Sequence, residues 1–363
     1  MQGTGIYSDP FLIESVEDLA AVGKGLDVDG INDYSLASYY KLGKNLDFED
    51  GNSYEDYMGL DIFDSDDDDN NQETLRNALT SEDNGKGWSP IGSFLTPFTG
   101  TIDGSGHIIY NIYIKRPDQD YIGLLACSAG EIFDLGLFQG NIYGDSHIGG
   151  LMGMNKNGTI NNCYSAISVF GYEYLGGLVG RNYAGNISKS YAVSNVNGNF
   201  RTGGLVGRNY GGNIFESYTT GHVAGEEYVG GLTGSNVNAG KIYNSYSTTN
   251  ITANKIGGGL TGINRGEIFR CYAAGNVTVI NSFSGGLVGY HDEINGIINN
   301  SYYDTSATGQ NDTNKGIPLS PIDMQKQASF INWEFLNIWQ IDENESYPYL
   351  KNNLQTPHPT PFM

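Results

Sequence analysis

Two sets of carboxylates in this chain of 363 residues have types and spacings that could do chemistry. Glu173 and Glu227 each stand three residues before a Gly-Gly pair, and Glu226 lies beside the second of them. Hydrolysis of a glycosidic bond needs two carboxylates at a set separation. If these two turns were stacked two repeats apart, about 9.6 Å would separate the pair, which fits an inverting mechanism. No Arg or Lys cluster accompanies them in the sequence, so a polysaccharide-degrading lyase or glycosidase is the alternative and not the main prediction.

The second set is an acidic run centred on Asp64, Asp66 and Asp68. Carboxylates at alternate positions could supply oxygen ligands to a calcium ion, although the run lacks the turn glycine and final glutamate of an EF-hand loop. A solvated loop is the competing interpretation. Asp103 and His107 could also suggest acid-base chemistry, but a turn aspartate and a polar strand residue explain them more simply.

A third group could bind a ligand. Arg181-Asn182-Tyr183 recurs as Arg208-Asn209-Tyr210 in the next repeat. Stacked repeats would place the two arginines and the two tyrosines about 5 Å apart. Further aromatic residues stand just before the Gly-Gly pairs, namely Tyr174, Phe200, Tyr228 and Phe283. Exposed rings beside polar donors can stack on sugars or anchor a protein, whereas the alternative is an outer ladder that only covers the edges of the repeats.

The elements that must position these residues are repeats. Gly-Gly-Leu blocks open six copies, and successive copies start 27 or 28 residues apart; they begin at Gly149, Gly176, Gly203, Gly230, Gly258 and Gly285. A fixed period of this length is typical of a solenoid. Each copy then carries an isoleucine followed by Ser-Tyr or Cys-Tyr, and most carry a third β-type run. Three short runs cannot bury a core alone, but stacked copies can. We therefore predict an all-β, parallel, right-handed β-solenoid with short helical caps at both ends.

Three positions of the repeat have predicted structural roles. The leucine of each block is expected to point into the core, and the glycines to permit corners that a Cβ would strain. An asparagine recurs two residues after each of the first five blocks and is expected to hydrogen-bond its neighbours at a corner; these are Asn155, Asn182, Asn209, Asn236 and Asn264. The tyrosines from Tyr164 to Tyr302 are expected to form a further structural ladder.

The cysteines also fit the repeat. Cys163 and Cys271 occupy the same position four copies apart, so about 19 Å separates them, which is beyond disulfide reach. Together with Cys127 they are expected to be buried free thiols.

Four segments are predicted along the chain. Residues 1–87 form an N-terminal cap with an acidic insertion, 88–304 the solenoid, 305–354 a C-terminal cap and 355–363 a linker or tail. Ser15 to Asp18 resembles a helix capping box, and Ser320-Pro321 a second helix start. The aromatic residues Trp333, Phe335, Trp339, Tyr347 and Tyr349 are expected to seal the last coil.

The net charge of the chain restricts the classes of partner that it can bind. The net charge is -22, and no basic stripe offsets it, so nucleic acid and an anionic membrane surface are unfavourable partners. No run of 18 apolar residues is present, so we expect no membrane insertion.

The repeat blocks resemble the GLUG motif of bacterial surface and secreted proteins. The flanks are similar too, including Asp9 to Leu19, Trp88 to Gly92, Phe98 to His107 and Trp333 to Leu350. The resemblance implies a β-solenoid outside the cell or on the bacterial cell surface, often within large adhesin-like proteins of which some carry a peptidase elsewhere. No catalytic residues come with the motif, and the chain contains no His-Glu-x-x-His.

The expected function is therefore an adhesive or structural module without catalysis, forming part of a larger surface protein. Its partner would be a glycan or a protein of a host or neighbouring cell, and its candidate surface is Arg181, Tyr183, Arg208, Tyr210, Tyr174 and Tyr228. No cofactor is expected, except that calcium could bind the acidic run. A pure spacer stalk is a further alternative, and featureless side faces would support it.

Overall fold

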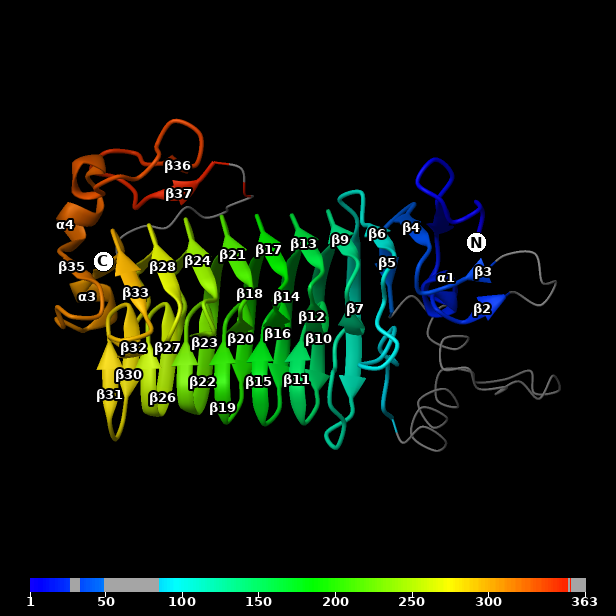
Figure 1. The fold of residues 1–363 in the computed structure, drawn as a ribbon, viewed down its shortest axis with the longest axis horizontal. Helices are drawn as coiled ribbons and strands as arrows, with labels where there is room; N and C mark the ends of the chain where they lie inside the picture. Colours follow the sequence, from blue (N-terminus) through cyan, green and yellow to red (C-terminus); the bar gives the residue numbers. More distant parts are fainter. Residues whose placement is uncertain (27–32, 49–84, 352, 354–363) are drawn as a thin grey trace, which may run out of the picture.

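The computed structural model describes residues 1–26, 33–48, 85–351 and 353, which form an elongated parallel β-solenoid (Figure 1). The predicted fold class is confirmed, including short helices near both ends. Asp64, Asp66 and Asp68 lie outside the described residues, so the calcium site stays a prediction. The predicted segment boundaries also stay predictions.

One sheet contains ten parallel strands among the described residues. In order along the solenoid they are β1 (Phe11–Ile13), β4 (Tyr39–Leu42), β6 (Thr101–Asp103), β9 (Glu131–Phe133), β13 (Thr159–Asn161), β17 (Asn186–Ser188), β21 (Asn213–Phe215), β24 (Lys241–Tyr243), β28 (Glu267–Phe269) and β33 (Ile297–Asn299). Because β1 and β4 belong to this sheet, the N-terminal segment already contributes strands to the solenoid.

A second sheet contains seven described strands that cross the middle of Figure 1. They are β8 (Leu125–Ser128), β12 (Met152–Lys156), β16 (Val179–Tyr183), β20 (Val206–Tyr210), β23 (Thr233–Val237), β27 (Thr261–Asn264) and β32 (Val288–His291). Six of these strands begin directly after a Gly-Gly-Leu bend, and β8 begins after Gly123-Leu124, so the motif turns the chain from one sheet into this one.

The third sheet has sixteen strands in the described part of the chain. Ten follow one another: β5 (Leu46–Asp47), β7 (Ile108–Lys115), β10 (Gly136–Tyr143), β14 (Tyr164–Phe170), β18 (Tyr191–Asn197), β22 (Tyr218–Gly230), β25 (Tyr246–Ser247), β29 (Tyr272–Ala273), β34 (Tyr302–Asp304) and β35 (Ile317–Leu319). Six lie beside them: β11 (Ser146–Gly149), β15 (Glu173–Gly176), β19 (Phe200–Gly203), β26 (Asn250–Gly258), β30 (Val277–Val279) and β31 (Phe283–Gly285).

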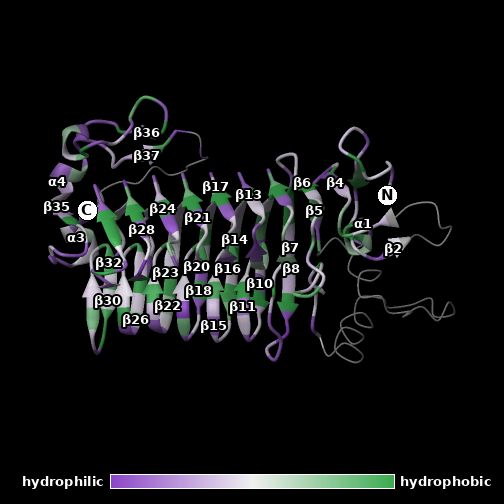
Figure 2. Cartoon of the chain, in the orientation of Figure 1, coloured by the Kyte–Doolittle hydropathy of each residue, from purple (hydrophilic) through white to green (hydrophobic). Residues whose placement is uncertain are grey.

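Equivalent residues of successive repeats pair in register, as the period predicts. Val179 pairs with Val206 in the seven-stranded sheet, Ile187 with Ile214 in the ten-stranded sheet, and Tyr191 with Tyr218 in the sixteen-stranded sheet. Figure 2 shows the consequence, because hydrophobic segments recur from coil to coil along the strands. The repeat therefore converts a sequence position into a column of like side chains.

The core confirms the leucine prediction and extends it. The six leucines from Leu151 to Leu287 are at most 1% exposed. The next residue is equally buried, as in Val179 and Val206. The leucine occupies the bend between two strands, and the following residue starts the second strand with its side chain also on the core side.

The glycines are required by close approach between coils. A Cβ on Gly177 would lie 2.3 Å from the carbonyl oxygen of Gly204 in the next coil. A Cβ on Gly180 would lie 2.4 Å from the backbone nitrogen of Ile148 in the previous coil. Contacts this short leave no room for any side chain, so the corner can form only with glycine.

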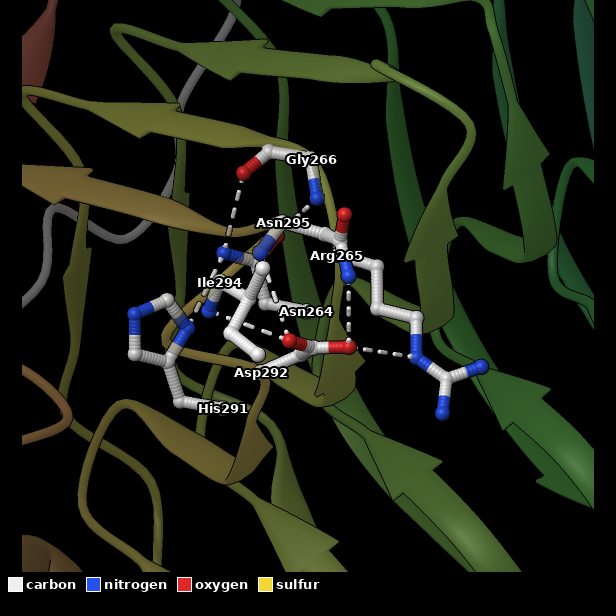
Figure 3. A network of polar contacts seen from close by, with 7 residues as sticks. All are labelled: Asn264, Arg265, Gly266, His291, Asp292, Ile294 and Asn295. Atoms are coloured by element: carbon white, nitrogen blue, oxygen red, sulfur yellow. Dashed lines mark hydrogen bonds and ion pairs between the residues drawn. The ribbon is translucent and has the colours of Figure 1, made fainter.

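The predicted asparagine ladder is present. The Nδ2 of Asn155, Asn182, Asn209 and Asn236 each donates to the Oδ1 of the next asparagine at 2.9 Å. All five asparagines are fully buried. The ladder ends at Asn264, where His291 takes the sixth position with its Nδ1 3.5 Å from the asparagine Nδ2 (Figure 3). Beside it, Asp292 accepts hydrogen bonds from Arg265 and Asn295 and closes this corner.

The N-terminal part contains helix α1 (Val16–Ala21), capped by Ser15 as predicted, and a two-stranded sheet of β2 (Gly25–Leu26) and β3 (Asp33–Tyr34). The C-terminal cap contains α3 (Thr305–Thr308), α4 (Pro321–Met324), the 3-10 helix η2 (Gln327–Ser329), and the antiparallel pair β36 (Trp339–Gln340) and β37 (Tyr349–Leu350). Ser320 caps α4 as predicted, but the helix ends at Met324 and does not continue to Phe330.

The C-terminal aromatics cover the last coil as predicted, because the Trp333 ring lies 6.0 Å from that of Tyr302, but they also extend further back along the solenoid. Trp339 contacts Tyr246 and Tyr272, which belong to two different coils, and Asn353 donates to the carbonyl of Glu216 further back. The cap therefore lies along the side of the solenoid over the tyrosine ladder, and not only across its last coil (Figure 1). The reason is that stacked tyrosines offer a long apolar surface, which the cap aromatics bury.

The cysteines agree with expectation. Cys127, Cys163 and Cys271 are free and fully buried, and burial raises the pKa of the last two thiols to about 12. In the described part of the chain, no helix has the length and apolar composition needed to cross a membrane.

Candidate functional site

The contacts of Asp103 and His107 stabilise local structure. The Asp103 carboxylate accepts hydrogen bonds from the backbone N–H and the hydroxyl of Ser105 and lies 3.7 Å from Lys41. His107 Nδ1 lies 3.3 Å from the Asn45 side chain. These contacts fix a turn between two strands, as the simpler interpretation predicted.

Glu173 and Glu227 lie in one column, each paired in register with Phe200 of the coil between them. Contrary to expectation, cations accompany both carboxylates. Arg201 forms an ion pair with Glu173, and Lys255 lies 3.4 Å from Glu227 and 3.5 Å from Glu226. These partners are about one repeat away in sequence, so only stacking brings them together. Both carboxylates are therefore already paired with a cation of a neighbouring coil.

The predicted arginine and tyrosine pairs form a stacked ladder on β16 and β20. The rings of Tyr183 and Tyr210 lie 5.3 Å apart and within 5° of parallel. The Arg181 guanidinium lies 5.2 Å from the centres of both rings, and the Arg208 guanidinium lies 5.0 Å from the centre of Tyr210. The geometry is that of repeated cation–π contacts.

A second column lies at the turn before the Gly-Gly pairs. Its members each stand two residues before a glycine, which begins a Gly-Gly pair in every case except Gly123 after Tyr121. All have a positive φ of 53° to 60°: Tyr121, His147, Tyr174, Arg201 and Tyr228. The His147 ring lies 4.6 Å from the ring of Tyr121 and 4.7 Å from that of Tyr174. The Arg201 guanidinium follows, 5.3 Å from Tyr174 and 5.6 Å from Tyr228. Aromatic and cationic groups thus stack continuously across five coils.

The two columns meet at Tyr174. The Arg208 guanidinium lies 5.5 Å from its ring, and Arg208 Nη1 donates to its hydroxyl at 3.2 Å. We call the combined surface of Tyr121, His147, Tyr174, Arg181, Tyr183, Arg201, Arg208, Tyr210 and Tyr228 the cationic aromatic face. All its members except the buried His147 are half-buried, so their edges reach solvent. The structure therefore brings all six predicted binding residues together.

The charges of this face are only partly balanced. Arg201 has Glu173, but neither Arg181 nor Arg208 pairs with a carboxylate in the part of the chain that the structure describes. Among the described residues, nothing accepts a hydrogen bond from the buried Nε atoms of Arg181 and Arg208. Burial, followed by repulsion from Arg208, lowers the pKa of Arg181. Two adjacent guanidiniums without a counter-ion make a site that favours an anion.

His147 belongs to the same environment. It is 8% exposed, its Nδ1 lies 3.0 Å from the Ser146 hydroxyl, and its Nε2 has no hydrogen-bond partner. Burial and the positive charges of Arg181 and Arg208 lower the pKa of His147 to about 4. The imidazole is therefore neutral at physiological pH.

Sequence reasoning missed His147, Arg201 and Tyr121. The available signal was their constant place two residues before the glycine that begins each bend, which they share with Tyr174 and Tyr228. Phe200 was predicted to lie in this column, but it stands three residues before its glycines. It pairs in register with Glu173 and Glu227 instead.

Metal ligands do not gather elsewhere in the described residues. Within residues 1–26, 33–48, 85–351 and 353, no three His, Cys, Asp or Glu side chains lie close enough to hold a metal ion.

Two adjacent repeats, residues 171–197 and 198–224, match the family model described as "The GLUG motif". The chain thus carries GLUG repeats, and the resemblance seen in the sequence is confirmed. Because the matched residues include β15 to β21 and the start of β22, the motif supplies most of the cationic aromatic face.

Two relatives have similar sequences. A candidate Gly-rich membrane protein of Evansella cellulosilytica is 38% identical over 89 residues, which are 23% of this chain and 10% of that protein. Halomucin of Haloquadratum walsbyi is 30% identical over 169 residues, which are 44% of this chain and 2% of halomucin. The chain therefore matches only small parts of much longer proteins.

Two solved structures share the fold. One is described as a candidate immunoglobulin A1 protease of Bacteroides ovatus; it is 19% identical, with a TM-score of 0.57 over 97% of this chain and 95% of that one. The other is named IgA1 Protease; it is 16% identical, with a TM-score of 0.50 over 80% of this chain and 21% of that one. At these identities the likeness is one of fold alone.

Proposed function

We propose that this chain is a non-catalytic β-solenoid module of a larger protein displayed at the cell surface, and that its cationic aromatic face binds an acidic glycan. The observation that carries the proposal is the stacked pair of Arg181 and Arg208, which lack carboxylate partners in the described structure although the chain has a net charge of -22. Acidic residues are abundant, yet they do not neutralise these two guanidiniums. An anionic ligand would do so.

The chemistry of the face fits a sugar that carries a carboxylate or sulfate. Tyr183 and Tyr210 present parallel rings 5.3 Å apart, and aromatic rings of this kind stack on the apolar faces of pyranoses. Guanidinium groups recognise carboxylates and sulfates through paired N–H donors. Successive coils repeat the arrangement, which suits a polymer with a repeating charge.

The relatives support a surface location. One is named as a membrane protein and the other as halomucin, and the chain corresponds to a small fraction of each. A rigid solenoid with binding groups along one face is a suitable building block for a long extracellular protein.

The test is binding of purified chain to an array of neutral, carboxylated and sulfated glycans, followed by calorimetry on each hit. The double variant Arg208→Ala, Tyr210→Ala should weaken binding to acidic glycans at least tenfold. The matched control is Tyr39→Ala, Lys41→Ala, which removes a tyrosine and a cation at the same spacing from β4, where Lys41 already lies 3.7 Å from Asp103.

Several results would overturn the proposal. Acidic glycans bound equally by both double variants would remove the face as the site, and an array without acidic hits would favour a protein partner or a spacer. Release of shortened glycan products would support the alternative of a polysaccharide-degrading enzyme.

A further inference from the structure

A cleft of about 530 Å³ lies between the ten-stranded sheet and the C-terminal cap, on a different sheet from the cationic aromatic face. Its floor includes Phe269 of β28 and Asn299 of β33, and its wall includes Asn332, Trp333 and Ile338 of the cap. Volumes of this size are typical of sites for small molecules or single units of a polymer.

The floor continues an aromatic strip. Phe215, Tyr243 and Phe269 pair in register on β21, β24 and β28, and Asn299 follows on β33. The rings of Phe215 and Tyr243 lie 6.0 Å apart and 25° from parallel. All three rings are half-buried on the outer side of the sheet. A line of rings therefore leads from the sheet into the cleft.

The wall is fixed before any ligand binds. Trp333 Nε1 donates to the carbonyl of Asn300 at 2.8 Å, and the Trp333 ring lies 4.3 Å from that of Trp339. Trp339 in turn packs on Tyr246 and Tyr272 of the tyrosine ladder. The cleft thus has the preorganised shape that reduces the entropy cost of binding.

The polar groups of the cleft are mostly amides with free hydrogen-bonding capacity. In the described part of the chain the side chains of Arg270, Asn299 and Asn332 make no hydrogen bond or ion pair, and both asparagines are exposed. The Glu334 carboxylate is already used, because it accepts hydrogen bonds from the backbone N–H groups of Leu336 and Asn337. The amides and the N–H donors of Arg270, beside aromatic rings, match sugar hydroxyls beside C–H faces.

We infer that this cleft is a second binding site, which takes one pyranose residue of a neutral glycan while the chain of that glycan extends along Tyr243 and Phe215. Phe269 provides the stacking surface, and Asn299 and Asn332 bind hydroxyl groups. The inference does not depend on the cationic aromatic face, because the two sites share no residue.

The probes are three neutral tetrasaccharides, built of β-1,4-linked glucose, α-1,4-linked glucose and β-1,4-linked mannose, together with tetragalacturonate as the acidic arm. Saturation-transfer NMR detects contact, and calorimetry measures affinity. We expect at least one neutral tetrasaccharide to bind, Phe269→Ala to weaken it about tenfold or more, which corresponds to about 1.4 kcal/mol, and Asn299→Ala to weaken it less. Phe133→Ala is the matched control, because Phe133 occupies the same column position on β9.

Two outcomes overturn the inference. The first is that none of the three neutral probes binds at millimolar concentration, and the second is that both variants bind like the parent chain. Asn299 is exposed, so its alanine variant decides the question even if Phe269→Ala disturbs the sheet. Tetragalacturonate bound in a way that depends on Arg208, and not on Phe269, would belong to the other face and would separate failure of one proposal from failure of the other.

Discussion

Two ladders of stacked tyrosines in this solenoid have nearly the same geometry and different surroundings. In the covered ladder, Tyr246 and Tyr272 lie 4.8 Å apart and within 3° of parallel. In the cationic aromatic face, Tyr183 and Tyr210 lie 5.3 Å apart and within 5°. The cap buries the covered ladder, where Tyr246 and Tyr272 are at most 2% exposed, whereas Tyr183 and Tyr210 remain half-buried.

The comparison shows that stacking alone does not indicate function. Any aromatic residue at a fixed position of a 27-residue repeat will stack, because the coils are in register. The two ladders differ in whether the C-terminal cap covers them and in whether they contain unpaired charges. The covered ladder is neutral, and the Tyr272 hydroxyl donates to the carbonyl of Pro348 at 2.8 Å. The cationic aromatic face contains two guanidiniums without carboxylate partners in the described structure.

The largest predicted effect is on stability in the covered ladder. Tyr272→Ala should reduce the free energy of unfolding by about 3–5 kcal/mol, because it removes a fully buried ring that packs on Trp333 and Trp339. Tyr183→Ala should cost about 1 kcal/mol or less, since its ring is half-buried. Denaturant unfolding followed by circular dichroism measures both. Equal losses for the two variants would show that the open face is as structural as the covered one.

The next effect is a pH dependence confined to the cationic aromatic face. Burial and the adjacent Arg181 and Arg208 lower the pKa of His147 to about 4, whereas an unfolded histidine has a pKa of about 6.5. The unfolded state therefore binds the extra proton first, and this contribution to stability is present above pH 6.5 and lost between pH 6.5 and 4. The difference between these two pKa values corresponds to about 3 kcal/mol.

The control for this prediction is His147→Gln, which keeps a polar side chain that does not titrate. The difference in unfolding free energy between parent and variant should shrink by about 3 kcal/mol from pH 7 to pH 4. Carboxylates titrate alike in both proteins and cancel. A difference that stays constant across this range would show that His147 keeps an ordinary pKa and that water reaches its imidazole.

The smallest predicted effect is the change in stability when a guanidinium of the cationic aromatic face is removed. Arg208→Met should change the unfolding free energy by less than about 1 kcal/mol, because loss of the hydrogen bond to Tyr174 is offset by relief of the repulsion with Arg181. Thermal unfolding of the parent and the variant at the same salt concentration measures it. A loss of unfolding free energy above about 2 kcal/mol would mean that this guanidinium stabilises the stack of coils and is not available to a ligand.

Much of the fold could be predicted because the repeat fixes the register. The period placed Leu178, Asn182 and Tyr191 in their columns, and it also placed Arg181 above Arg208. The side-on position of the cap could not be predicted, because it depends on which surface its aromatics bury, and Trp339 has no period to follow. The ion pairs of Glu173 and Glu227 were missed because their partners lie about one repeat away and outside the conspicuous motif.

The central claim is that Arg181 and Arg208 form a binding site for an anionic ligand. NMR of their side chains tests this claim most directly. Both Nε atoms are buried without a partner, so their N–H signals should be resolved from those of exposed arginines. Titration with the acidic glycan that binds best should shift both signals in a saturable manner and leave Arg265, which already contacts Asp292 at 3.2 Å, unchanged. Saturable glycan binding that leaves the signals of Arg181 and Arg208 in place would contradict the account.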